Sequence, residues 1–188
     1  LTLFNKPSFS VSVAAMMLCI LALSGSWLMI FQFLQGVSGL SALHAGLVMV
    51  PAALLQTAAS LLVPRLSRWL APTKLISGGL VLAAGGLALM LLIHADSNLA
   101  LMVAASVLLG VGIMPMMILG TDLVIGSAPP EKTGAAAATS ETATELGMAM
   151  GIAVIGSVGA TLYRSSMEQQ LSGVLDSHQL AVGSDTIG

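Results

Sequence analysis

Apolar and charged residues divide the chain into five long apolar segments. No charged residue occurs between Lys6 and Arg65. A membrane-crossing helix needs about 20 mostly apolar residues, so this stretch is long enough for two crossings. A polar, glycine-rich run at 36–41 separates the two. We predict membrane-spanning helices at about 8–34, 42–64, 74–93, 99–127 and 134–163.

The apolar runs favour helices over strands because they are continuous. Strands of a membrane barrel alternate apolar and polar residues over about ten positions, and these runs, rich in Ala, Leu and Met, do not alternate. Lipid offers the backbone no hydrogen-bond partners, and a helix satisfies its backbone groups internally. The prediction is an all-α integral membrane fold with about five transmembrane helices.

The end of the chain is polar, and we expect residues 165–188 to be a loop outside the membrane. Leu171 and Leu175 stand at helical spacing within it. This spacing predicts a short helical extension of the last apolar segment at the start of the loop.

Composition excludes several classes of protein. The 188 residues are 56% hydrophobic and 7% charged, whereas a soluble domain is about one quarter charged. An ordinary soluble enzyme and a disordered tail are therefore both excluded. The net charge of −2 gives no support to nucleic-acid binding, which needs a basic patch. The single cysteine, Cys19, cannot form an internal disulfide.

Lysine and arginine set the expected orientation. If the helices alternate in direction, five of the six basic residues lie on one side of the membrane: Lys6, Arg65, Arg68, Lys74 and Lys132. Only Arg164 lies on the other side. Because basic residues are enriched in cytoplasmic loops, we expect the N-terminal end to be cytoplasmic and the C-terminal tail to face outward.

Two acidic residues interrupt the last apolar segment. Glu141 and Glu145 are four positions apart and therefore share one helix face. An acid inside a membrane helix costs about 2.5–3.5 kcal/mol on insertion scales, and such residues are functional by default. Two charged carboxylates about 6 Å apart repel by about 3 kcal/mol at an effective dielectric constant near 20. This repulsion favours a form that holds one proton, which is the chemistry that exchange of protons for cations needs.

A structural role is the alternative for both glutamates. Each would then hydrogen-bond to Thr or Ser on a neighbouring helix, or lie close enough to the cytoplasm to be hydrated. Replacement by glutamine separates the two hypotheses, because a structural hydrogen bond tolerates the amide and proton exchange does not.

Three residues are secondary candidates for the site. Asp122 is expected to be an interfacial acid that pairs with Lys132 or Arg68, since charges at helix ends reach water. Gln56 lies near mid-membrane, where an interhelical hydrogen bond is the usual role and a cavity-lining contact the alternative. Trp27 belongs by default to the interfacial aromatic belt, although its ring could also stack on a flat cation.

Glycines and prolines indicate close packing and bending. Gly147 and Gly151 form a G-x-x-x-G pattern, which lets two membrane helices approach closely. Together with the two glutamates, this pattern predicts that the last segment is buried among other helices. Pro51 and Pro115 are candidate hinges, although proline is common in membrane helices.

Other chemistry has no signature in the sequence. No combination of His, Cys and acidic residues has metal-ligand spacing, and no phosphate-binding loop is present. We therefore expect no metal, no catalytic residue and no cofactor, with protons as the coupling ion.

Three stretches together resemble a known family. They are FLQGVSGLSALHAGL at 33–47, LVIGSAPPEKTGAAA at 123–137 and ETATELGMAMGIA at 141–153. The chain resembles, over about residues 4–164, the drug:proton antiporters of the major facilitator superfamily that have fourteen transmembrane segments. Most members carry Asn or Ser and then Arg-Gln where this chain has Glu141 and Thr144-Glu145. Acids at these positions look like the branch that exports quaternary ammonium antiseptics and methyl viologen.

The resemblance implies a place for each part of the chain. Residues 1–164 would be a partial transporter domain from the C-terminal half, holding the ninth to thirteenth segments of a multi-pass protein of the bacterial inner membrane. We expect a fragment, since the chain starts at Leu1 rather than Met. Its implied partners are lipophilic cations, protons, membrane lipid and the remainder of the same polypeptide.

The implied function is export of lipophilic cations in exchange for protons at Glu141 and Glu145. Two alternatives stay open. The protein could export neutral or anionic compounds and use the acids only for protons, or it could be a structural membrane protein that transports nothing.

Overall fold

The computed structural model describes residues 5–94 and 98–171 of the chain. Within these residues it contains helices and no strands, and five of the helices are long and apolar enough to cross a membrane. The all-α membrane fold expected from the sequence is confirmed. In chain order the elements are α1 (Pro7–Gln32), η2 (Phe33–Val37), α2 (Ala42–Leu66), α3 (Pro72–Met90), α4 (Leu99–Ser127), η3 (Pro130–Lys132) and α5 (Thr133–Leu171).

Proline and capping side chains set several helix boundaries. Pro7 and Pro72 occupy the first turn of α1 and α3, where the N–H that proline lacks has no helical partner to lose. The side chain of Asn98 caps α4 by accepting a 3.0 Å hydrogen bond from the Ala100 N–H. At the other end of α4, Ala128 is extended (ψ 149°), as expected for a residue that precedes proline.

Several predicted helix ends differ from the structure by two or three residues, including that of the second helix, which ends at Leu66 instead of 64. The first helix does not stop at 34, because the π-helical turn η2 carries it to Val37 before Gly39 turns the chain with a φ of +64°. The third helix covers Pro72–Met90 instead of 74–93, because Pro72 starts it early and the apolar residues after Met90 form only turns. These differences arise because apolarity alone does not mark where the backbone leaves the helix.

The fifth helix also extends beyond its predicted end near residue 163. It continues to Leu171, so residues 165–171 are helical rather than a loop. The predicted helical extension is thus confirmed as far as Leu171, while Leu175 lies outside the described residues.

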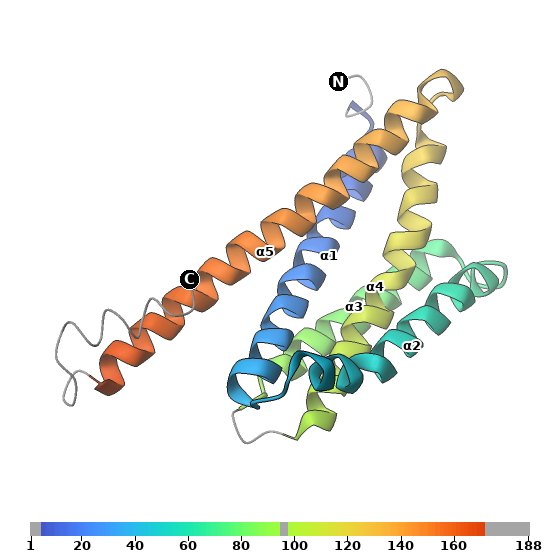
Figure 1. Ribbon diagram of the computed structural model, residues 1–188. Coiled ribbons are helices and arrows are strands. Elements are labelled where there is room, and N and C mark those ends of the chain that lie inside the picture. Colours follow the sequence, from blue (N-terminus) through green and yellow to red (C-terminus); the bar gives the residue numbers. More distant parts are fainter. Residues whose placement is uncertain (1–4, 95–97, 172–188) are drawn as a thin grey trace.

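Helix α4 connects the bundle, because it packs against α1, α2 and α3 and more lightly against α5. Helix α1 lies between α4 and α5 (Figure 1). The main partner of α5 is α1, which runs parallel to it, and the two helices diverge toward the C-terminal end of α5 (Figure 1).

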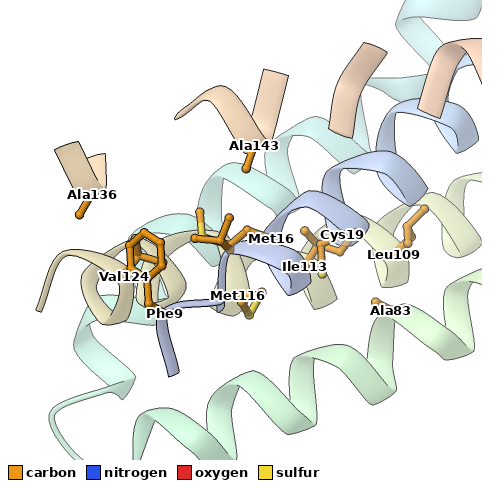
Figure 2. Packing of buried hydrophobic residues seen from close by; sticks show 11 residues of the cluster. Phe9, Met16, Cys19, Ala83, Leu109, Ile113, Met116, Val124, Ala136 and Ala143 are labelled. Carbon is orange, nitrogen blue, oxygen red and sulfur yellow. The ribbon is translucent and has the colours of Figure 1, made fainter. Parts of the chain in front are cut away.

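Large apolar side chains fill the α1–α4 interface, while the buried residues that α3 and α5 contribute to it are alanines. Figure 2 shows Phe9, Met16 and Cys19 of α1 facing Ile113 and Met116 of α4. Ala83 of α3 and Ala143 of α5 close this cluster from two sides. A second cluster joins α1, α2 and α4 nearer the other end and contains Ile30, Leu34, Ala45, Met49 and Met102.

Helices α3 and α4 touch through their backbones. A Cβ added to Gly86 would lie 2.5 Å from the Leu109 amide nitrogen and 2.8 Å from the Ala105 carbonyl oxygen. A Cβ added to Gly79 would lie 2.5 Å from the Gly112 carbonyl oxygen. Such contacts are typical of membrane helices, whose association relies on close packing rather than on burial from water.

Candidate functional site on helix α5

Helix α5 meets α1 along a face of small residues. Its buried positions near this contact are Ala136, Ser140, Ala143, Gly147 and Gly151. A Cβ on Gly147 would lie 2.5 Å from the Met17 carbonyl oxygen, and one on Gly151 would overlap the Ser24 side chain. The two glycines of the G-x-x-x-G pattern therefore bring the α1 and α5 backbones into contact.

Two serines add polar contacts to this interface. The Ser24 hydroxyl lies 3.2 Å from the Met148 carbonyl oxygen across the interface and 3.3 Å from the Leu21 carbonyl oxygen of its own helix. The Ser140 hydroxyl is buried and lies 3.8 Å from the Met16 sulfur. Neither serine was recognisable from the sequence, because helical serines usually bond only to their own turn and neither interrupts the apolar pattern.

Glu141 and Glu145 project away from α1. Glu141 and Glu145 stand two residues before Ala143 and Gly147, the α5 residues that are buried against α1. Two residues of an α-helix correspond to a rotation of about 200°. Both glutamates are exposed on the bundle surface. Glu145 lies near the middle of the apolar span Pro130–Leu162, so the exposed carboxylates are at membrane depth and not at a helix end.

Within the described residues this segment is covered by helices on one face only, so its predicted burial among several helices is not seen in this part of the protein. Only 11% of its apolar window is buried, because α1 covers one face and α4 touches it lightly. The G-x-x-x-G pattern marks a single close contact, and it says nothing about the remaining faces of the helix.

The arrangement presents two carboxylates one helical turn apart on an apolar surface. The rise between positions 141 and 145 is about 6 Å, which is close enough for the two groups to share one proton or one bound cation. Among the described residues, no group of three or more His, Cys, Asp or Glu could hold a metal ion.

The structure places Trp27 away from the glutamates. Its ring stacks on Phe31, with ring centres 5.6 Å apart and planes at 24°. The next residue, Leu28, lies beside Gly156 of α5, eleven positions past Glu145. That spacing corresponds to about 16 Å along the helix, so Trp27 and the glutamates do not form one site in the described structure.

Gln56 lies at the contact between α2 and α4. Its side chain fills the space beside Gly110, where an added Cβ would overlap the carboxamide. The Nε2 atom is buried and has no hydrogen-bond partner among the described residues. This nitrogen therefore does not make the predicted interhelical hydrogen bond, because the residue that it meets on α4, Gly110, has no side chain to accept one.

The two prolines lie inside continuous helices. Pro51 is exposed in α2, and Pro115 is buried in α4. The Pro115 ring would lie 3.0 Å from a Cβ on Gly79, so it packs directly on α3.

Asp122 is exposed near the end of α4, where it lines an open groove against the start of α1. It belongs to a different part of the molecule from the α5 glutamates.

A model of the Major Facilitator Superfamily matches residues 1–152. The chain belongs to this superfamily. The five apolar helices and the central packing of α4 are thus the described part of an all-α transporter fold.

Relatives of the chain carry the names of efflux or resistance proteins. The chain is 36% identical to the multidrug efflux pump LfrA of Mycolicibacterium smegmatis over 99% of its own length and 36% of that protein. It is 28% identical to the methyl viologen resistance protein SmvA of Salmonella typhimurium, over 99% of its length and 37% of that protein. The tetracenomycin C resistance and export protein of Streptomyces glaucescens is 29% identical over 83% of the chain.

The chain therefore spans about a third of the length of these relatives. The superfamily match and the five apolar helices place the chain in a multi-pass membrane protein.

Proposed function

We propose that this chain is part of an inner-membrane exporter that exchanges lipophilic cations of the quaternary ammonium type for protons. Glu141 and Glu145 are its shared site for the proton and the cation. The observation that carries the proposal is the pair of exposed carboxylates near the middle of an apolar helix. Carboxylates at this depth are costly and mark ion pathways in membrane proteins.

Competition at one site provides the coupling. When the pair holds a proton its negative charge is reduced, and a cation binds less well. When the pair is deprotonated, it attracts a cation from the cytoplasm or the inner leaflet. Protonation from the outside then releases the cation, while rocking of the two halves of the transporter alternates access.

The position of the glutamates supports a cavity rather than a packing role. A packing carboxylate would face α1, where Ser24 offers a hydroxyl group, yet both glutamates lie on the other side of α5. We assign the covering of this face to the remainder of the polypeptide. The name of the relative SmvA supports a cationic substrate, since methyl viologen is an aromatic dication.

The test uses the full-length parent protein in inside-out membrane vesicles with an imposed pH gradient. Uptake of a fluorescent lipophilic cation into the vesicles, which corresponds to export from the cell, is measured for the wild type, Glu141→Gln and Glu145→Gln at equal expression. Losing one partner of a desolvated ion pair costs about 2–5 kcal/mol, and 1.4 kcal/mol corresponds to tenfold. Each variant should therefore lose at least about tenfold in pH-driven transport.

Glu131→Gln is the matched control, because Glu131 is an exposed acid in η3, outside the long helices. It should transport normally. Normal transport by both α5 variants would refute the proposal and place the coupling site elsewhere in the parent. If the protein transports a neutral drug and this transport is lost in both glutamine variants, the alternative in which Glu141 and Glu145 carry only protons is favoured.

A further inference from the structure

A groove lies at the end of the bundle where α1 begins and α4 ends. It has a volume of about 640 Å³ and is open on one side. Its lining combines the apolar side chains of Val11 and Leu123 with the hydroxyls of Ser8 and Ser12 and the carboxylate of Asp122. The glutamates of α5 do not line it.

Asp122 is the only charged residue among those that line the groove. Its carboxylate forms no hydrogen bond or ion pair with any residue that the structure describes. The nearby cation Lys6 donates a 2.7 Å hydrogen bond to the Ser127 carbonyl oxygen at the C-terminal end of α4. This bond directs the Lys6 ammonium to the helix end, a position that favours cations.

The depth of the groove fits the edge of the cytoplasmic leaflet. Asp122 is five residues from the end of α4, about 8 Å along the helix, whereas Glu145 is about 18 Å from the start of α5. The basic residues of the chain predict that this end of the bundle is cytoplasmic. A molecule in the inner leaflet would meet Asp122 before it reached the depth of the glutamates.

We propose that this groove is an entry site for lipophilic organic cations that arrive from the inner leaflet. The Asp122 carboxylate binds the charged group, Ser8 and Ser12 supply hydroxyl oxygens, and Val11 and Leu123 contact the apolar part. A lining that combines a carboxylate and hydroxyls with apolar side chains matches an amphiphilic cation and disfavours an anion. The assignment of this role rests on the proposed export of cations.

The first measurement is the KM for pH-driven uptake of tetraphenylphosphonium into inside-out vesicles that carry the full-length parent. Asp122→Asn should raise the KM about fivefold and leave the maximal rate unchanged. This is the effect of losing one partly exposed ion pair of about 1 kcal/mol. Asp122→Glu should restore most of the affinity, and Glu131→Gln should behave as the wild type. An unchanged KM in Asp122→Asn, or an equal rise in Glu131→Gln, would overturn the proposal.

The second measurement does not depend on proton coupling. Binding of tetraphenylphosphonium to the purified parent in nanodiscs is measured in a variant with both Glu141→Gln and Glu145→Gln. Residual binding should remain and should be lost when Asp122→Asn is added. Residual binding that survives Asp122→Asn, or the absence of any residual binding, would refute the entry site. Failure of pH-driven transport in the wild type would instead refute the proposed function. The binding measurement would still test the entry site in that case.

Discussion

At the scale of single residues, the side chain of Gln56 occupies a position that costs free energy. Its Nε2 is buried without a hydrogen-bond partner among the described residues, and a buried unpaired donor costs about 1–3 kcal/mol. The position exists because Gly110 leaves room for the carboxamide on α4. Gly110 therefore gives the Gln56 carboxamide enough space but no hydrogen-bond partner.

This fit predicts a measurable coupling between the two positions. Gly110→Ala should destabilise the full-length protein by about 1–3 kcal/mol, because the added methyl group overlaps Gln56 in a packed interface. Adding Gln56→Ala should recover much of that loss, since the overlapping carboxamide is gone. Melting temperatures of the purified protein in nanodiscs, taken as a double-mutant cycle, measure the effect.

Gly126 is the matched control because it lies on α4 and has nothing within 4 Å of an added Cβ. Gly126→Ala should be neutral or stabilising, as alanine has the higher helix propensity. Strict additivity of Gly110→Ala and Gln56→Ala would show that the contact does not exist in the membrane.

Side-chain contacts between helices were the features least predictable from the sequence. Gln56 was recognisable as a polar residue in an apolar run, yet its unpaired nitrogen depends on which side of α4 it meets. Ser24 gave no signal, because its partner is a backbone carbonyl 124 positions away along the chain. Contacts of this kind are set by helix packing, which one sequence does not encode in a readable pattern.

At the scale of helices, the α1–α5 pair depends on glycine at two positions. Gly151→Ala should place a methyl group on the Ser24 side chain and separate the two helices. We expect faster amide hydrogen exchange in α5 than in the wild type, with little change in α3, which has α4 as its main partner. Hydrogen-exchange mass spectrometry of the full-length protein in nanodiscs gives this comparison helix by helix.

Gly134→Ala serves as its control, since Gly134 lies on the same helix with open space around it. Exchange in α5 should then be unchanged or slower. Equal exchange in the Gly151 and Gly134 variants would contradict the close packing of α1 on α5.

Helices were the most predictable elements because their signal is long-range and redundant. Each span contains many apolar residues, so the number of spans does not depend on any one position. Ends were less predictable, as η2 and the extension of α5 to Leu171 show. The G-x-x-x-G pattern predicted a close contact but not its partner, because a small-residue face fits any helix of suitable shape.

At the scale of the whole molecule, the bundle leaves much apolar surface exposed. Leu43, Leu54, Val81 and Leu162 are each more than 60% exposed, as expected for helices that meet lipid or further parts of a longer protein. The exposed face with Glu141 and Glu145 is unsuited to lipid, because charged groups there are costly. We therefore expect lipid on the apolar faces and protein or water on the glutamate face.

The orientation of the bundle in the membrane is a testable prediction. The α2–α3 connection holds Arg68 beside Trp69, which is 88% exposed, and the basic residues predict that it is cytoplasmic. Ser38 is exposed in the α1–α2 connection, at the other end of α2. In a parent protein without other cysteines, Trp69→Cys should react with a membrane-impermeant maleimide only in inside-out vesicles, and Ser38→Cys only in intact cells.

Cys19 provides an internal control for this experiment. It is buried in α1 against the α4 interface, so a protein that keeps only Cys19 should react from neither side. The reverse pattern of labelling for Trp69→Cys and Ser38→Cys would invert the bundle. The Asp122 groove would then face outward, on the side where an exporter releases its substrate, so it could not be the proposed entry site. The depth of the α5 carboxylate pair in the membrane would not change. Orientation therefore decides the entry proposal independently of the proton-coupling chemistry.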